Sequence, residues 1–103
     1  MASVERVFPA DHPAAQGHFP GNPVIPGAVL LAATLRAIEQ ELGVDLSSWR
    51  LRSAKFLAPA RPGERVTIEF TRSADGAIRF ACAVGQRTLL KGVLQCDTGA
   101  AEA

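Results

Sequence analysis

This sequence has few cysteines, few histidines and almost no net charge, and each of these features argues against a class of function. The 103 residues include two cysteines, Cys82 and Cys96, and two histidines, none at metal-ligand spacing. We interpret both cysteines as reduced core residues and expect no metal and no redox cofactor. The formal charge is +1. Because no cluster of Lys and Arg could neutralise a run of phosphates, nucleic acid is not an expected partner.

Long apolar runs are also missing. The longest mainly apolar stretch, residues 28–35, is far too short to span a bilayer. Near the first residue, Glu5 and Arg6 stand where a signal peptide would need its apolar segment. We therefore expect a cytoplasmic protein with no membrane partner.

The length and the composition favour one small globular domain. Apolar residues make up 48% of the chain and charged residues 20%, which excludes a disordered protein. We predict a single domain over residues 1–97 and a flexible tail over residues 98–103, which are small and polar. A chain of this size buries only roughly 60–65% of its unfolded surface, so we expect a homodimer or a higher oligomer.

One helix is predicted over Ala28–Leu42. This stretch contains no Pro or Gly, its large apolar residues recur at helical spacing, and Gly43 follows as a stop signal. Residues 28–33 are apolar on every side, whereas the second half is amphipathic. We therefore expect the first half to be buried all round, by a strongly curved sheet or by a second subunit.

Five other segments have the alternation or the composition of strands, namely Val4–Phe8, Trp49–Phe56, Val66–Thr71, Ile78–Val84 and Thr88–Cys96. Turn residues at 74–76 predict an antiparallel hairpin between the third and fourth, and Gly85-Gln86 forms a similar break. In the second segment the apolar face switches register, which indicates a bulge or cover on both faces. The predicted fold class is α+β, with one helix packed on an antiparallel sheet.

The segment from Gly17 to Gly27 has a proline at every third position from Pro20 and several glycines. Such a segment loses little conformational entropy on folding, so a rigid loop is expected. Pro26 suits the first helical position, where its missing N–H is not needed. Gly27 would then offer an unpaired backbone N–H at the positive end of the helix dipole, where a polarised carbonyl could bind.

His18 lies on this loop, and an imidazole is the side chain best suited to transfer a proton near neutral pH. The combination suggests proton transfer beside a carbonyl. A purely structural histidine is the alternative. His12 is the rival candidate, although Asp11-His12-Pro13 also has the composition of a simple turn.

The stretch HFPGNPVIPG at residues 18–27 resembles the signature of bacterial 3-hydroxyacyl-[acyl carrier protein] dehydratases, which have the hotdog fold. A second stretch, KFLAPARPGE at residues 55–64, resembles the strand and Pro-Gly-acid segment of the same family. The resemblance covers most of residues 4–96. It implies a long central helix wrapped by an antiparallel sheet, and a dimer in which two sheets join, with acyl tunnels at the subunit interface.

The resemblance also implies roles for individual residues. His18 would take the α-proton of a 3-hydroxyacyl thioester, oriented by the backbone carbonyl of Val24, and the N–H of Gly27 would hold the thioester carbonyl. We expect Phe19 and Pro26 to line the substrate site. The substrate would be carried on phosphopantetheine, as an acyl carrier protein or acyl-CoA thioester, in fatty acid, polyketide or polyene synthesis.

One element of the family pattern is missing. The family carries an Asp or Glu on the helix fourteen residues after the histidine, and that position is Ala32 here. Thr34 offers only a neutral hydroxyl, and Glu39 lies about 10 Å further along the helix axis. Loss of a positioned acid or base typically costs roughly 10²–10⁴ in rate, which makes ordinary dehydratase turnover doubtful.

Two functions therefore stay open. The first is a dehydratase with His18 as base and with water, Thr34, His12 or Asp11 assisting the leaving group. The second is a catalytically impaired, thioester-binding subunit that pairs with a hotdog paralogue bearing the acid. A thioesterase is a weaker third reading, because such enzymes also usually need a polar group on the helix.

Overall fold

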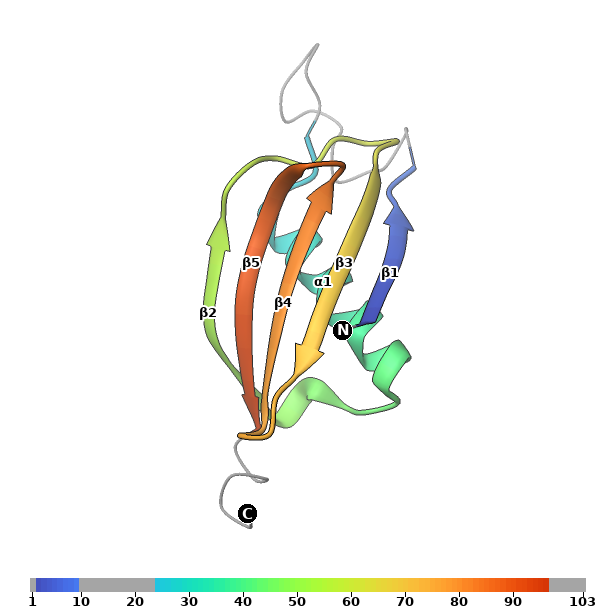
Figure 1. Ribbon diagram of the computed structural model, residues 1–103. Coiled ribbons are helices and arrows are strands. Elements are labelled where there is room, and N and C mark those ends of the chain that lie inside the picture. Colours follow the sequence, from blue (N-terminus) through green and yellow to red (C-terminus); the bar gives the residue numbers. More distant parts are fainter. Residues whose placement is uncertain (1, 10–23, 97–103) are drawn as a thin grey trace.

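The computed structural model describes residues 2–9 and 24–96. These residues form one five-stranded antiparallel sheet with a long helix across one of its faces (Figure 1). The strand order is β1-β3-β4-β5-β2, so β1 and β2 are the edges. The elements are β1 (Ala2–Val7), α1 (Gly27–Leu42), a 3-10 turn η2 (Leu46–Ser48), β2 (Trp49–Phe56), β3 (Arg65–Arg72), β4 (Ala77–Val84) and β5 (Arg87–Cys96). The predicted α+β arrangement is confirmed.

Every strand begins and ends within two residues of its predicted position. β3 and β4 form the predicted hairpin, closed by a turn in which Ser73 N–H donates to Ala77 O at 2.8 Å and Gly76 has φ 84°. β4 and β5 form a second hairpin around Gly85, at φ 59°. The register of β2 against β5 shifts between Leu51 and Ser53, which favours a bulge, one of the two alternatives expected for this segment. The sequence did not indicate η2.

The helix also ends where the sequence predicted. Gly43 adopts the left-handed conformation at φ 68° and donates its N–H to Glu39 O at 2.8 Å. The start differs by one residue. Pro26 is the N-cap, with an extended ψ of 145°, and Gly27 is the first helical residue. The prediction for Pro26 was therefore wrong by one position: its backbone is extended rather than helical, and its carbonyl accepts the first helical hydrogen bonds, as that of an N-cap residue does.

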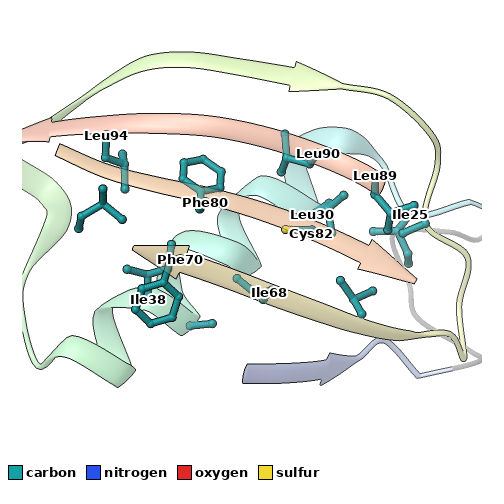
Figure 2. Close-up of a cluster of buried hydrophobic side chains, with 14 of the residues drawn as sticks. Ile25, Leu30, Ile38, Ile68, Phe70, Phe80, Cys82, Leu89, Leu90 and Leu94 are labelled. Atoms are coloured by element: carbon teal, nitrogen blue, oxygen red, sulfur yellow. The ribbon is translucent and has the colours of Figure 1, made fainter. Parts of the chain in front are cut away.

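The core lies between the inner face of the sheet and one face of α1 (Figure 2). Apolar side chains alternate along β3 and β4 and meet the helix from the sheet side, as Ile68 and Phe80 do. Leu30 and Ile38 contribute from the helix and are 2% and 0% exposed. Burial of this continuous apolar cluster is what holds the helix on the sheet.

The sheet alone does not bury the first half of α1 on all sides. Of the two expected covers, the strongly curved sheet is excluded, and cover by a second subunit stays a prediction. Leu30 faces the core, but Ala28 and Ala32 are exposed, and Val29 and Leu31 are half-buried. A five-stranded sheet of this curvature covers only one side of the helix. The opposite side remains an uncovered apolar face beside the edge strand β2.

Candidate functional site

The segment that leads into α1 is held against the connection between β2 and β3. Ile25 N–H donates to Ala60 O at 2.8 Å and the two residues form an isolated bridge. Both are buried, at 2% and 0% exposure. The start of the helix is therefore fixed by a residue 35 positions away in the chain, which no local pattern indicates.

The β2–β3 connection is itself tied to two other strands. Leu57 N–H donates to Leu89 O at 2.8 Å, and Gly63 N–H donates to Phe8 O at 2.7 Å. The Glu64 carboxylate accepts from Arg61 N–H at 2.8 Å and from the Arg87 guanidinium at 2.9 Å through both of its oxygens. This connection consequently anchors the chain both just after β1 and just before α1.

A pocket of about 520 Å³ opens between these segments. Its lining is almost entirely apolar and contains no ionisable side chain among the described residues: Val24, Ile25, Pro26, Gly27, Leu30, Phe56, Leu57, Ala58, Pro59 and Ala60. Phe56 and Leu57 are about half exposed, so the pocket is open to one side in the single chain. An apolar, partly open pocket with a few polar backbone groups suits an acyl chain.

The polar group at this pocket is the N-terminus of α1. Pro26 O accepts from both Val29 N–H at 3.0 Å and Leu30 N–H at 3.1 Å. Within residues 2–9 and 24–96, the amides of Gly27 and Ala28 have no hydrogen-bond acceptor. The Gly27 amide therefore combines a free donor with the positive end of the helix dipole, as expected for a group that polarises a carbonyl.

Position 27 of the chain is in close contact with the ring of Phe56. A β-carbon built there would lie 2.9 Å from Cε1 of Phe56. The ring of Phe56 therefore packs directly on the backbone at the start of α1. This ring forms a wall of the pocket beside the free amide, and the sequence alone did not single it out as a site residue.

Ala32 lies on the uncovered face of the helix, one turn beyond Ala28. No other described carboxylate takes its place at the pocket. Glu39 lies near the far end of α1, where its carboxylate accepts from Leu46 N–H at 2.8 Å. A side chain at position 32 would project away from the sheet, so an acid there would not be forced into the core.

Thr34 and Cys82 lie together in the core. The Thr34 hydroxyl donates to Leu30 O at 2.8 Å and lies 3.0 Å from the sulfur of Cys82. Since the hydroxyl proton is already used, the thiol donates to the hydroxyl oxygen. Thr34 is 0% exposed and its hydroxyl lies on the sheet side of α1, whereas Ala32 is exposed. A role of Thr34 in assisting the leaving group stays a prediction. Burial raises the pKa of the Cys82 thiol.

Cys82 is buried in the core, as expected, whereas Cys96 at the end of β5 is only half-buried. Of the predicted site residues, the structure brings Val24, Pro26 and Gly27 to one pocket. His18, Phe19, His12 and Asp11 lie outside the described residues, as does the predicted tail at 98–103.

The described part of the chain contains no group of His, Cys, Asp and Glu side chains that could hold a metal ion. None of its helices is long and apolar enough to cross a bilayer.

Comparison with known proteins identifies the family. A family model described as "ApeI-like: ApeI dehydratase" matches residues 1–97. The chain belongs to the ApeI-like dehydratase family. Among its relatives, the 3-hydroxyacyl-[acyl-carrier-protein] dehydratase FabZ of Chlamydia trachomatis is 37% identical over 91 residues, covering 76% of this chain and 60% of the relative. The same enzyme of Caulobacter sp. is 33% identical over 81 residues, covering 68% and 50%.

The chain thus spans about half to three-fifths of the length of these relatives. Solved structures show the hotdog fold shared by this family. The dehydratase heterocomplex ApeI:P from Xenorhabdus doucetiae superposes with a TM-score of 0.71 at 18% identity, over 90% of this chain and 83% of that chain. A 1,4-dihydroxy-2-naphthoyl-CoA thioesterase from Synechocystis gives 0.63 at 18% identity, over 89% and 77%. The resemblance noted in the sequence is confirmed at the level of family and fold.

Proposed function

We propose that this chain is a dehydratase-type hotdog subunit that binds 3-hydroxyacyl thioesters in the pocket at the start of α1. The observation that carries the proposal is the free Gly27 amide, which opens on an apolar pocket in a member of a dehydratase family. The amide would hold the thioester carbonyl and stabilise the negative charge that develops on its oxygen when the α-proton leaves. The acyl chain would lie against Phe56 and Leu57.

His18 is the proposed base. The neutral form of an imidazole can accept the α-proton, and in the proposed arrangement the Val24 carbonyl orients the ring. Removal of the proton and departure of the 3-hydroxyl as water leave the enoyl thioester. No metal or redox cofactor takes part in this proposal, since the phosphopantetheine arm only carries the substrate.

Ala32 supports a second candidate function. Without a carboxylate at this position, a homodimer lacks an obvious group to protonate the departing hydroxyl. The chain would then serve as a subunit that donates His18 and Gly27 to a composite site, with the acid supplied by a hotdog paralogue. That one structural neighbour is itself a dehydratase heterocomplex is consistent with such pairing.

In either case a second hotdog chain would pack on the apolar face that the sheet leaves open. This face comprises Ala28, Leu31 and Ala32 on α1 and Leu51 and Phe56 on β2. Leu51 is 39% exposed and Phe56 is 50% exposed. Since β2 is an edge strand, its unpaired backbone groups can pair with another strand, and the two sheets would join there.

The test is an ultraviolet assay of enoyl thioester formation from a 3-hydroxyacyl-pantetheine substrate. We expect slow turnover that is abolished by His18→Ala. The variant Ala32→Glu should raise the rate, whereas the matched amide variant Ala32→Gln, which cannot donate a carboxylic proton, should not. If the folded wild type and Ala32→Glu both form no product, even at high enzyme concentration, the dehydratase proposal fails.

The same assay distinguishes the paired subunit. A partner bearing the acid but with its own histidine removed should become active when mixed with this chain, and His18→Ala in this chain should abolish that activity. A protein that remains a homodimer and never exchanges with such a partner contradicts the second candidate.

A further inference from the structure

The β2–β3 connection holds the chain on both sides of residues 10–23. In Figure 1 it lies at the same end of the sheet as the end of β1 and the start of α1. Phe8 O accepts from Gly63 N–H at 2.7 Å, and Ile25 N–H donates to Ala60 O at 2.8 Å. The two attachment points in the connection are only three positions apart. One short stretch of backbone therefore fixes both ends of the segment that contains the proposed base.

A β-turn closes this stretch. Glu64 N–H donates to Arg61 O at 3.2 Å, and Gly63, the third residue of the turn, has φ 87°. A positive φ at the third position, after a proline such as Pro62, is typical of a type II turn. The turn orients the Gly63 amide, which is the donor to Phe8 O. Its geometry thus sets where the chain after β1 is held.

The Glu64 side chain fastens the turn to β5. One carboxylate oxygen accepts from Arg61 N–H at 2.8 Å, and both oxygens accept from one terminal nitrogen of Arg87 at 2.9 Å. Arg87 is the first residue of β5 and lies opposite Val84 on β4, so its backbone belongs to the sheet. Hydrogen bonds between opposite charges are stronger than neutral ones. The carboxylate therefore connects the turn with a rigid part of the fold.

A short path leads from the turn to Gly27. Ala60 immediately precedes the turn and binds Ile25 through its carbonyl, and both residues are buried. Pro26 follows Ile25, and its ring fixes φ at −57°. Gly27 comes next and lines the pocket. Since the proline ring removes one of the backbone rotations on this path, a shift at Ala60 should move the Gly27 amide with it.

The apolar wall of the pocket is held by other contacts. Leu57 N–H donates to Leu89 O at 2.8 Å, seven positions before Glu64. Phe56 lies opposite Leu90 in the pairing of β2 with β5. Neither contact involves the turn. Loss of the Glu64 carboxylate should therefore displace the polar groups of the site, while its apolar surface stays in place.

We propose that Glu64 is a positioning residue for the reaction at the pocket, and that it acts through Arg87 and the turn after Ala60. This inference rests on the proposed function for the roles of His18 and Gly27, whereas the connection itself is argued from hydrogen bonds. A misplacement of about 1 Å in reacting groups can cost about a hundredfold in rate. Burial of an apolar chain is non-directional and tolerates such a shift. Glu64 should thus affect kcat more than KM.

Amide hydrogen exchange, followed by NMR at one pH, tests the connection without turnover. In Glu64→Ala the amides of Ile25 and Gly63 should exchange at least about tenfold faster than in wild type, because the turn that holds their acceptors or orients them opens more often. The Ser73 amide, which donates to Ala77 O at 2.8 Å just beyond the other end of β3, should keep its rate. A general loss of stability would instead raise all three rates.

Kinetics with a 3-hydroxyacyl-pantetheine substrate test the effect on the reaction, with each rate corrected for the folded fraction from urea unfolding. Glu64→Ala and Arg87→Ala should each lower kcat about tenfold and change KM less than about threefold. The double variant should be no slower than Glu64→Ala, because both changes remove the same contact. Glu64→Gln keeps an oxygen for the Arg61 amide and should be intermediate. Glu5→Gln, which breaks the exposed pair with Arg65, is the matched control and should stay within about twofold of wild type.

Unchanged exchange of the Ile25 and Gly63 amides in Glu64→Ala overturns the proposal, as does an equal increase at Ser73. A raised KM with an unchanged kcat also overturns it, since the carboxylate would then support binding only. If wild type never forms the enoyl thioester but the two amides exchange faster in Glu64→Ala, the proposed activity fails and the connection stands. If wild type turns over and Glu64→Ala keeps its kcat, the activity stands and the positioning role fails.

Discussion

The ring of Phe56 lies directly against the backbone of Gly27, so closely that a β-carbon at position 27 would approach Cε1 of the ring to 2.9 Å. This contact joins the end of edge strand β2 to the first residue of α1. It places an apolar wall beside the free amide that the proposed function uses. Because Phe56 is 50% exposed, its ring can move outward when crowded.

Gly27→Ala is therefore expected to impair thioester binding more than folding. The new methyl group displaces the Phe56 ring from its place in the pocket wall, and because the ring is half-exposed the loss of stability should be limited to about 1 kcal/mol. Isothermal titration with a non-hydrolysable thioester analogue measures the first effect, and thermal unfolding the second. The double variant Gly27→Ala, Phe56→Ala should recover part of the binding, because the ring is gone. If the single and the double variant lose the same affinity for the thioester analogue, the Phe56 ring is not the cause of the weaker binding.

Gly92→Ala should instead destabilise the fold. A β-carbon at this position would overlap Cζ of Phe80 and lie 2.7 Å from the backbone oxygen of Ser53. The Phe80 ring is buried, and the Ser53 oxygen belongs to the backbone of β2, which is paired with β5. Overpacking of this kind costs about 1–3 kcal/mol. Urea unfolding measures the loss. Gly85→Ala is a useful control, because a β-carbon at position 85 would meet no other atom. Its cost in stability, about 1 kcal/mol, would come only from the positive φ of 59°.

Thr34→Val tests whether the threonine takes part in catalysis. Its hydroxyl is committed to Leu30 O and to the thiol of Cys82 in the core, so its loss should cost about 1 kcal/mol of stability. The dehydration rate per folded molecule should not change. A rate that falls tenfold in Thr34→Val and returns in Thr34→Ser would restore the auxiliary role expected from the sequence.

The Glu64–Arg87 ion pair predicts a stability that depends on pH. Burial raises the pKa of Glu64, but hydrogen bonds from Arg87 and from the Arg61 amide outweigh it and leave this pKa below its ordinary value. A lowered folded-state pKa stabilises the protein above the unfolded pKa of about 4.5, and this contribution disappears as pH falls through the folded value.

Glu64→Gln should accordingly be less stable than wild type at pH 7, and the difference in the free energy of unfolding should shrink as the pH falls below about 4.5, as urea unfolding over a series of pH values will show. The pair is partly exposed, so the difference at pH 7 should be below about 1 kcal/mol. Glu5→Gln breaks the exposed 3.8 Å pair with Arg65 and should change little at any of these pH values. A constant gap between wild type and Glu64→Gln across this range would refute the assignment.

Leu51→Lys should weaken subunit association. Leu51 lies on the edge strand β2 beside the uncovered apolar face, whereas Val7 lies on the opposite edge, β1, and is 54% exposed. A lysine at position 51 would place a charge in the proposed junction between two sheets, so the oligomer should dissociate at higher concentration in light scattering. Val7→Lys is the matched control and should leave the oligomer intact. If Val7→Lys dissociates it and Leu51→Lys does not, β1 is the joining edge.

Local patterns were enough to predict most of the fold. The helix over residues 28–42 was expected from its apolar spacing and from Gly43, and the β3–β4 hairpin from its alternation and turn residues. These features depend on neighbours within a few positions, where spacing and backbone preference act directly. The same holds for the bulge in β2, which the switch of apolar face indicated.

The sequence by itself thus determined which segments become helix and strand, and it supplied the motif that identifies the family. Only the tertiary structure decided that Ala60 fixes Ile25, that Phe56 covers Gly27, that Thr34 faces the core, and that Glu64 pairs with Arg87. Each of these relations joins residues brought together by sheet order, or depends on which side of the helix the sheet covers. The order of the strands and the side of the helix that the sheet covers are set by hydrophobic burial and strand register over the whole chain. The spacing of residues within a short segment therefore cannot predict these contacts.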